Sequence, residues 1–281
     1  MRRKFTDQHP ELSGFQQRQV LKQPFFNCHQ STRPSCPPGV RLYLTGMTTV
    51  RGTQSVGLIG GLAVGATVHY YQAIVAACQL QTFSPSLIIA HADVNDVLKM
   101  IAAGELEPLA QYLAGLIHRL EAAGMSHVAI TAITPHLCIE RLLPRIRLPL
   151  INLLTETLEA LRANHIRKVA LFGTRFSIET RLFCGLEGIE VVSPTAEEIT
   201  YIHDTYLDIA RGGGGTAQQL SGLSDLANRL CDREQLDAIV LAGTDFSLIF
   251  NDATINFPAI DCARVHIEAI VRVLAAPGVG E

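Results

Sequence analysis

The chain has 281 residues, of which 48% are apolar and 17% are charged, and these proportions are typical of a globular protein with one or two domains. Its formal net charge of -3 at pH 7 provides no basic field that would attract nucleic acid or an anionic membrane. We therefore expect the partner to be a small molecule.

The seven cysteines form no CxxC pair and no cluster with histidines at metal-ligand spacing, which argues against a disulfide framework and a zinc site. This usage is typical of a reducing compartment, so a cytoplasmic location is predicted. No apolar run approaches the roughly 20 residues that a membrane helix needs, and no secretory signal is recognisable. A soluble protein is expected.

Residues 1–54 differ from the rest of the chain. They are basic, rich in glutamine and proline, and show no helical or strand period. Such a segment is predicted to be a disordered N-terminal extension that takes no part in the fold. A transit peptide and a partner-binding arm are the alternatives, and Met47 also suggests an over-extended reading frame.

From Ser55 onward, short apolar runs alternate with helical patterns, which indicates an α/β protein with a mostly parallel sheet. Helices with apolar positions three and four apart are expected at 66–78, 104–124 and 217–235. The glycine run at 212–215 is expected to be a flexible loop between two helices. Strands are expected at 55–61, 86–92, 127–133, 148–154, 168–174, 189–194 and 237–243.

The strand ends reveal an internal repeat. Residues 56–67, VGLIGGLAVGAT, resemble residues 169–180, VALFGTRFSIET, and HVAITAITPHL stands at a similar offset from DAIVLAGTDFS. Two copies of one α/β unit predict two pseudo-symmetric domains, at 55–155 and 156–281, with a C-terminal helix that is free to cross over. The ligand cleft is expected between them, because parallel sheets bind ligands beyond the carboxyl ends of their strands.

Gly60 and Gly61 lie between a predicted strand and a predicted helix, where backbone amides can approach an anion at the helix N-terminus. A tight turn without a ligand is the alternative. Nucleotide binding is not favoured, because Leu62 occupies the second glycine position of a GxGxxG motif and no lysine follows.

Thr134, Thr174 and Thr244 each stand at or just beyond the end of an apolar strand. Each hydroxyl could cap the next helix or hydrogen-bond a bound carboxylate. Their matched positions in the repeat favour joint carboxylate binding.

These motifs resemble the aspartate/glutamate racemase family, which also includes hydantoin racemase, maleate isomerase and arylmalonate decarboxylase. The likeness runs from about Ser55 to the C-terminus and is carried by GLIGGLAVGAT, LFGTRFSIET and FPAIDCARVHI. It implies two pseudo-symmetric α/β domains, no cofactor, no metal, a small carboxylate in the cleft, and a homodimer.

The resemblance also identifies a departure from the family pattern. Family members usually remove and return a proton at the substrate α-carbon with two cysteines, one at a strand end in each half. In this sequence Ala132 and Gly243 stand at those positions, and neither can move a proton. The chain is therefore expected to be a divergent member that cannot use the two-thiol mechanism.

His136 and Asp245 are the candidates for replacement chemistry. The unperturbed pKa of a histidine lies near neutrality and suits acid-base work, although His136 could instead orient the loop or contact substrate. Asp245 follows Thr244 at a predicted helix start, where capping is the alternative role. Cys138 and Cys262 could be relocated thiols, but buried free cysteines are usually inert.

The expected function is that of an amino-acid racemase or isomerase acting without a cofactor on a small amino or hydroxy (di)carboxylate such as aspartate or glutamate. A lyase, decarboxylase or hydrolase on the same scaffold is the first alternative, since an anion-binding pocket can stabilise charge in other reactions. A non-catalytic carboxylate-binding protein is the second.

For Asp261 and His266, a role in closing the cleft is favoured over chemistry.

Overall fold

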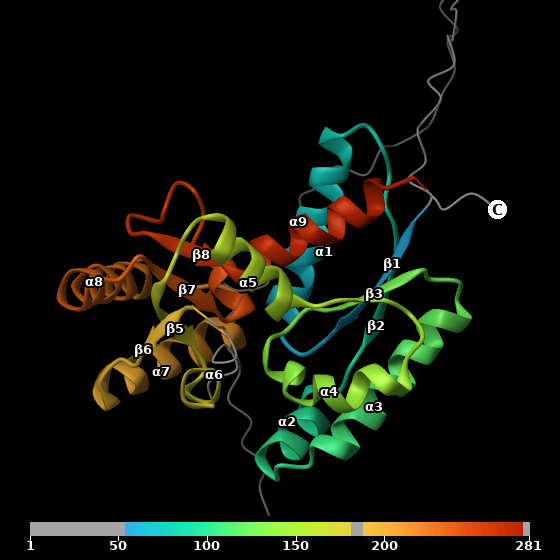
Figure 1. The fold of residues 1–281 in the computed structure, drawn as a ribbon, viewed down its shortest axis with the longest axis horizontal. Coiled ribbons are helices and arrows are strands. Elements are labelled where there is room, and N and C mark those ends of the chain that lie inside the picture. Colours follow the sequence, from blue (N-terminus) through green and yellow to red (C-terminus); the bar gives the residue numbers. More distant parts are fainter. Residues whose placement is uncertain (1–53, 181–187, 278–281) are drawn as a thin grey trace, which may run out of the picture. The chain divides into compact units, whose positions relative to one another are not determined.

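The computed structural model describes residues 54–180 and 188–277, which belong to one compact unit of the chain (Figure 1). Residues 1–53 of the predicted N-terminal extension lie outside the described residues, so the prediction of disorder there stays a prediction. Strands and helices alternate along the described chain, as the sequence pattern predicts.

The first half contains a parallel sheet in the order β2-β1-β3-β4. Its strands are β1 (Ser55–Gly60), β2 (Ser86–His91), β3 (His127–Ile130) and β4 (Leu150–Ile151). The helices that accompany it are α1 (Val64–Leu80), α2 (Val94–Ala102), α3 (Leu106–Ala122), η1 (Thr134–Cys138), α4 (Ile139–Leu142) and η2 (Leu143–Arg145).

The second half repeats this arrangement in a parallel sheet of order β6-β5-β7-β8. Its strands are β5 (Lys168–Gly173), β6 (Glu190–Val192), β7 (Ala238–Ala242) and β8 (Ala259–Asp261). The remaining helices are α5 (Leu153–Ala163), α6 (Arg175–Glu179), α7 (Ala196–Gly212), α8 (Ala217–Glu234), η3 (Thr244–Leu248) and α9 (Cys262–Ala275). The predicted fold of two similar parallel-sheet halves is confirmed.

Two details of the strand prediction were wrong. The strand expected at 148–154 is only two residues long, because Asn152 accepts hydrogen bonds from the backbone N–H groups of Leu154 and Thr155 and so starts α5. A short buried apolar run is compatible with either a strand or a helix, and here the N-cap residue determines that a helix begins. The short strand β8 was not predicted, since its three residues lie within the loop-like segment around Pro258.

The first sheet is covered on both faces by separate cores. On one face, α3 buries Leu109, Leu113 and Ile117 against the sheet. On the other face, Tyr70 of α1 packs in one cluster with Ile270 of α9. Helix α9 follows β8 of the second sheet yet packs against α1 and α5, so it ties the two halves together (Figure 1).

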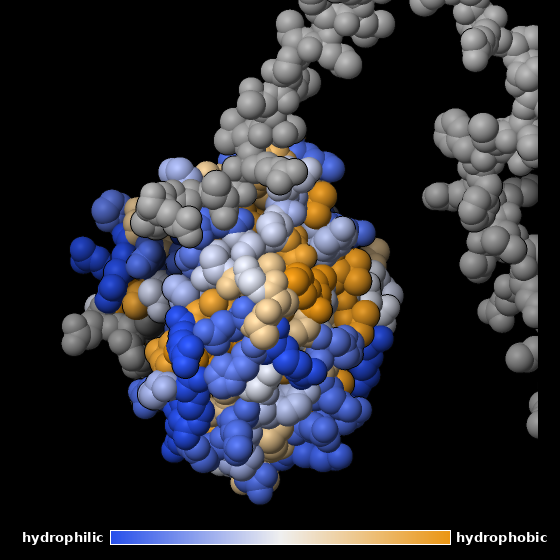
Figure 2. All heavy atoms as spheres, turned by 90° about the vertical axis from the view of Figure 1, so that its right-hand side faces the viewer, coloured by the Kyte–Doolittle hydropathy of each residue, from blue (hydrophilic) through white to orange (hydrophobic). Residues whose placement is uncertain are grey.

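Some large apolar side chains remain at the surface of the first half. On α1, Val68 and Tyr71 are each 48% exposed, and on the edge strand β2, Ile88 and Ile89 are 37% and 40% exposed. Figure 2 views the molecule from the side of the first sheet and shows apolar residues gathered on part of this face. Within the described ranges, no helix has the length and apolarity needed to cross a membrane.

Candidate functional site

A cavity of about 420 Å³ lies where the carboxyl ends of strands from both sheets meet. The chain just beyond β1, β3, β5 and β7 lines it, together with side chains from α2 and α7. The predicted site residues that line the cavity are Gly61, Thr134, Thr174, Thr244 and Asp245. Ala132 and Gly243, where the resemblance predicts thiols, line it as well.

The glycine turn after β1 is fixed by backbone geometry. Gly61 has φ +87°, and a Cβ at this position would lie 2.6 Å from the carbonyl oxygen of Ala92, so only glycine fits without strain. The N–H of Gly61 donates to Thr67 Oγ1 at 3.0 Å. Gly60 is the last residue of β1 and does not line the cavity. The amide of Gly61 is therefore engaged within the turn.

The N-terminus of α1 faces a carboxylate from the second half. The backbone N–H of Ala66 donates to Asp245 Oδ1 at 3.3 Å, which places a negative charge at the positive end of the helix dipole. A second bond between the halves joins the hydroxyl of Thr244 to the carbonyl oxygen of Thr131 at 3.4 Å. The cavity floor is thus shared by both halves.

Tyr206 of α7 is a site residue that the sequence did not reveal. Its hydroxyl donates to Asp245 Oδ2 at 2.9 Å, and its ring packs edge-on against Phe246 with centroids 5.0 Å apart. A Cβ at Gly243 would overlap the Tyr206 ring, so the ring fills the space that a side chain at 243 would need. Tyr206 lies on the buried face of a regular helix, where nothing distinguishes it from an ordinary core aromatic.

The carboxyl group of Asp245 is fully buried. Burial raises its pKa above the ordinary aspartate value, while the hydrogen bonds from Tyr206 and Ala66 and the nearby His69 oppose the rise. Burial also holds the pKa of Tyr206 well above its usual range, so this hydroxyl remains a proton donor. A carboxylate with a raised pKa is a stronger base, which suits it for proton transfer.

The three threonines have different partners. Thr174 caps α6 by accepting the N–H of Ser177 at 3.1 Å, and Thr244 donates to the carbonyl of Thr131. Thr134 is half-buried at the cavity and makes no hydrogen bond through its side chain within the described ranges. Among the three, Thr134 has the most available hydroxyl for a ligand.

His136 lies behind the loop and does not line the cavity. Its Nδ1 is 2.9 Å from the carbonyl oxygen of Ala132 and 3.2 Å from that of Ile133, so Nδ1 carries the hydrogen. Nε2 is buried without a hydrogen-bond partner in the described part of the chain. Burial lowers the pKa of His136 to about 4. The imidazole is therefore neutral at neutral pH and orients the loop after β3.

The remaining candidates also lie outside the cavity lining. The thiols of Cys138 and Cys262 are buried and donate to backbone carbonyls, and burial raises the pKa of Cys138 to about 11. Asp261 caps α9 and accepts the hydroxyl of Ser247, and His266 bonds the carbonyl oxygen of Ile151 at 2.9 Å. Each of these groups holds backbone or neighbouring side chains in place.

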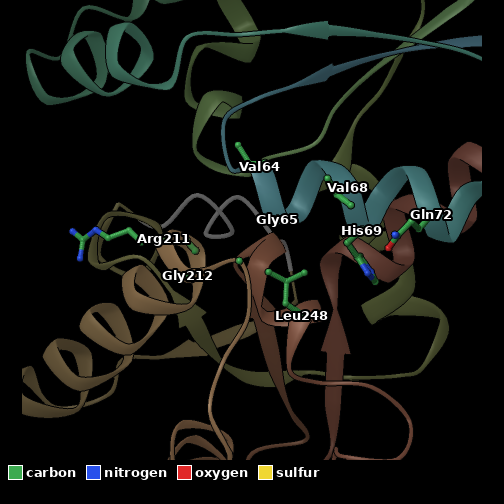
Figure 3. A pocket seen from close by; sticks show the side chains of 10 residues that line it. Val64, Gly65, Val68, His69, Gln72, Arg211, Gly212 and Leu248 are labelled. Atoms are coloured by element: carbon green, nitrogen blue, oxygen red, sulfur yellow. The ribbon is translucent and has the colours of Figure 1, made fainter. Parts of the chain in front are cut away.

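Arg211 is the one cationic side chain that lines the cavity among the described residues. It is 73% exposed and pairs with Asp208 at 3.6 Å. A second, more open hollow of about 420 Å³ adjoins the cavity through Val64 and Arg211. Figure 3 shows this hollow, with the Arg211 side chain extending away from His69 and Leu248. No group of three or more His, Cys, Asp or Glu side chains able to hold a metal occurs in 54–180 or 188–277.

The family model described as Asp/Glu/Hydantoin racemase matches residues 59–270. Solved structures with a similar fold include an aspartate racemase homologue from Pyrococcus horikoshii OT3, which is 22% identical with a TM-score of 0.70, and the aspartate racemase of Picrophilus torridus, which is 18% identical with a TM-score of 0.63. Both alignments cover 79% of this chain and 100% of the other.

A glutamate racemase from Francisella tularensis in complex with D-glutamate is 12% identical with a TM-score of 0.52, over 79% of this chain and 81% of that one. At these identities the likeness to the solved structures concerns the fold.

Proposed function

Because the chain belongs to the Asp/Glu/hydantoin racemase family, we propose that it is an isomerase that moves a proton at the α-carbon of a small amino or hydroxy carboxylate. The substrate occupies the cavity at the strand ends, and the reaction needs no cofactor. The observation that carries this proposal is Asp245, a residue of the cavity lining whose buried carboxyl group has a raised pKa and accepts a hydrogen bond from the Tyr206 hydroxyl.

The substrate carboxylate binds to hydrogen-bond donors from the first half. Thr134 lines the cavity, and its hydroxyl has no hydrogen-bond partner among the described residues. The N-terminal turn of α1 begins at Val64 on the cavity wall. Hydroxyls and helix N-termini both favour anions. The substrate charge also disfavours ionisation of Asp245, which strengthens this residue as a base.

Asp245 carries the proton in the proposed reaction. Its carboxylate accepts the proton from the substrate α-carbon, which leaves a planar enolate-like anion on the substrate. Water then protonates the opposite face of that carbon, and Asp245 gives its proton to the solvent. The Tyr206 hydroxyl stays bonded to Oδ2 and fixes the direction of the carboxylate. Tyr206 is thus a positioning residue, and Asp245 is the catalytic residue.

The first test is exchange of the α-hydrogen in deuterated water, followed by proton NMR for a panel of amino and hydroxy carboxylates. Asp245→Asn is expected to lower the exchange rate at least about 100-fold, because general base catalysis typically contributes this much. Asp252→Asn is the matched control, since Asp252 has a side chain that is 91% exposed and pairs with Arg264. Exchange that survives in Asp245→Asn would exclude Asp245 as the base.

The pH profile separates the role of Tyr206 from a merely structural one. The raised pKa of Asp245 places the acid limb of the rate profile above the pH at which an ordinary aspartate ionises. Tyr206→Phe removes a hydrogen bond that lowers the pKa of Asp245, so this limb should move to higher pH. An unchanged limb with a uniformly lower rate would mean that Tyr206 only supports the fold.

The distribution of ionisable groups favours a lyase as the second candidate. Every cavity-lining residue from 54–180, a continuously described stretch, lacks an ionisable side chain, and Tyr206, Arg211 and Asp245 all come from the second half. A base on one wall can return a proton to only one face of the α-carbon. Decarboxylation of a substituted malonate would then give a single enantiomer, whereas racemisation gives both, and chiral chromatography of the product distinguishes them.

A further inference from the structure

We propose that the substrate carries a bulky apolar group, such as an aromatic ring, on its α-carbon in place of the second carboxylate of aspartate or glutamate. This inference rests on the proposed function, because it concerns the ligand of the same cavity. It comes from the chemistry of the cavity walls, which the sequence motifs did not reveal.

The first-half wall of the cavity is apolar and partly uncovered. Helix α2 presents Val94, Val97, Leu98 and Ile101 to the cavity, and this spacing places them on one helical face. Leu98 is 55% exposed and Val64, at the start of α1, is 65% exposed. Two of the large apolar side chains that remain exposed in the described chain therefore line one hollow, and an apolar ligand group would remove them from water.

The same cavity offers little to a second carboxylate. Arg211, the one cation that lines it within the described ranges, is 73% exposed and already paired with Asp208. Asp245 would repel a second negative charge. A carboxylate that leaves water without a counter-charge or donors is unfavourable, so the apolar wall selects against dicarboxylates.

The volume agrees with a larger ligand. A hollow of about 420 Å³ falls within the range of about 300–1,000 Å³ that is usual for sites of drug-sized molecules. An aromatic ring against α2 would leave the carboxylate and α-carbon facing the polar floor formed by Thr134, Thr244 and Asp245. One molecule can thus contact the apolar wall with its ring and the polar floor with its carboxylate.

The decisive experiment compares matched pairs of compounds that share the reacting head and differ in the substituent. Mandelate and malate share a 2-hydroxycarboxylate head, and phenylglycine and aspartate share a 2-aminocarboxylate head. Isothermal titration calorimetry with the full chain is expected to show at least about tenfold tighter binding of mandelate and phenylglycine than of their partners, as burial of a ring on apolar side chains predicts. Tighter binding of malate and aspartate, or binding of none of the four, would overturn the proposal.

Leu98→Lys tests the wall itself. The exposure of Leu98 means that this change should not disturb the fold, and it should weaken mandelate binding about tenfold while leaving malate binding equal or stronger. Leu80→Lys is the matched control, because Leu80 is 87% exposed at the end of α1 and does not line the cavity. Mandelate binding that is equal in both variants would contradict the assignment.

Exchange of the α-hydrogen, measured on the same four compounds, separates this inference from the proposed function. Binding preference for mandelate and phenylglycine without exchange would support the substrate class and refute α-proton transfer. Exchange of malate or aspartate alone would support α-proton transfer and refute the substrate class.

Discussion

The Tyr206 ring fills the space beside Gly243 at the end of β7, where a side chain at residue 243 would lie. A methyl group at 243 would overlap the Tyr206 ring, so Gly243→Ala should displace the ring and break its hydrogen bond to Asp245. We expect a loss of stability of about 1–3 kcal/mol, as for other overpacked sites, and a lower α-hydrogen exchange rate. Urea unfolding and the exchange assay measure the two effects.

Gly115→Ala is the control for this substitution. Gly115 lies within α3, and no atom beyond its own helix backbone lies within 4 Å of an added Cβ. Alanine there should stabilise the protein by about 0.5–1 kcal/mol and leave exchange unchanged. If Gly243→Ala also stabilised the protein and left exchange unchanged, the position of the Tyr206 ring would not depend on the absence of a side chain at residue 243.

His136 predicts a pH dependence of stability. Its pKa is lowered to about 4 in the folded protein, below the ordinary value of 6.5, so the unfolded chain binds more protons between these values. The stability from neutral His136 is therefore present above about pH 6.5 and is lost as the pH falls towards about 4, at up to about 1.4 kcal/mol per pH unit.

His136→Asn should flatten this dependence, because an asparagine amide can donate to the carbonyl of Ala132 without titrating. Urea unfolding at about pH 7.5 and about pH 4.5 should show a smaller loss for the variant than for the wild type. The other buried groups with shifted pKa values are present in both proteins and contribute equally. They are His266, whose pKa is lowered to about 3, and Asp245 and Asp261, whose carboxyl pKa values are raised. Equal losses would mean that His136 is not buried as a neutral group.

The positions of single residues in the cavity lining were predictable where the residues directly follow the end of a strand. Thr134, Thr174, Thr244 and Asp245 were found by this rule, and all four line the cavity. Tyr206 was missed because it arrives from the middle of a helix that is far from these strand ends in sequence. Its contact with Asp245 depends on how α7 packs against η3 and β5, which local sequence does not specify.

At the scale of elements, α2 depends on its cap. Asp93 accepts hydrogen bonds from the N–H groups of Asn95 at 2.8 Å and Asp96 at 3.4 Å. Asp93→Ala should cost about 1 kcal/mol of stability and loosen the helix that forms the apolar wall, which should raise KM for an aryl carboxylate. Chemical denaturation and steady-state kinetics measure these outcomes.

Thr216→Ala is the matched change on α8, which contributes no residue to the cavity lining. Thr216 forms a capping box with Gln219, so a similar loss of stability is expected with KM unchanged. Equal effects of both changes on KM would show that α2 has no special relation to the substrate.

Elements with a long period were predicted well, and short ones were not. Helices α3 and α8 carry several turns of apolar spacing, which secures their identity. By contrast, β4 has two residues and β8 has three. Strands of this length are fixed by pairing with β3 and β7 rather than by their own sequence, so a single sequence offers no pattern to read.

At the scale of the whole molecule, the exposed apolar side chains of α1 and β2 suggest how two copies associate. We expect a homodimer formed through this face, because exposed apolar patches and unpaired edge strands favour association. Tyr71→Glu combined with Ile89→Glu should yield a monomer in sedimentation equilibrium. Tyr201→Glu, which changes an aromatic side chain of similar exposure on α7, should leave the dimer intact. A wild-type monomer would refute the expectation.

The repeat allowed the architecture to be anticipated at this scale. Matched strand ends at β1, β3, β5 and β7 predicted a shared hollow between two similar sheets, and the cavity lies there. The apolar character of one wall was not predicted, because α2 was not among the expected helices. The α2 side chains form a cavity wall only when the strand ends of the two halves come together.

The route of α9 has a consequence for biosynthesis. This helix follows β8, so the ribosome completes both sheets before the segment that covers the α1 side of the first sheet exists. Until α9 emerges, that apolar surface remains open to neighbouring nascent chains, a condition that promotes aggregation. Protection by a chaperone during translation should therefore matter more for the first half than its early place in the chain suggests.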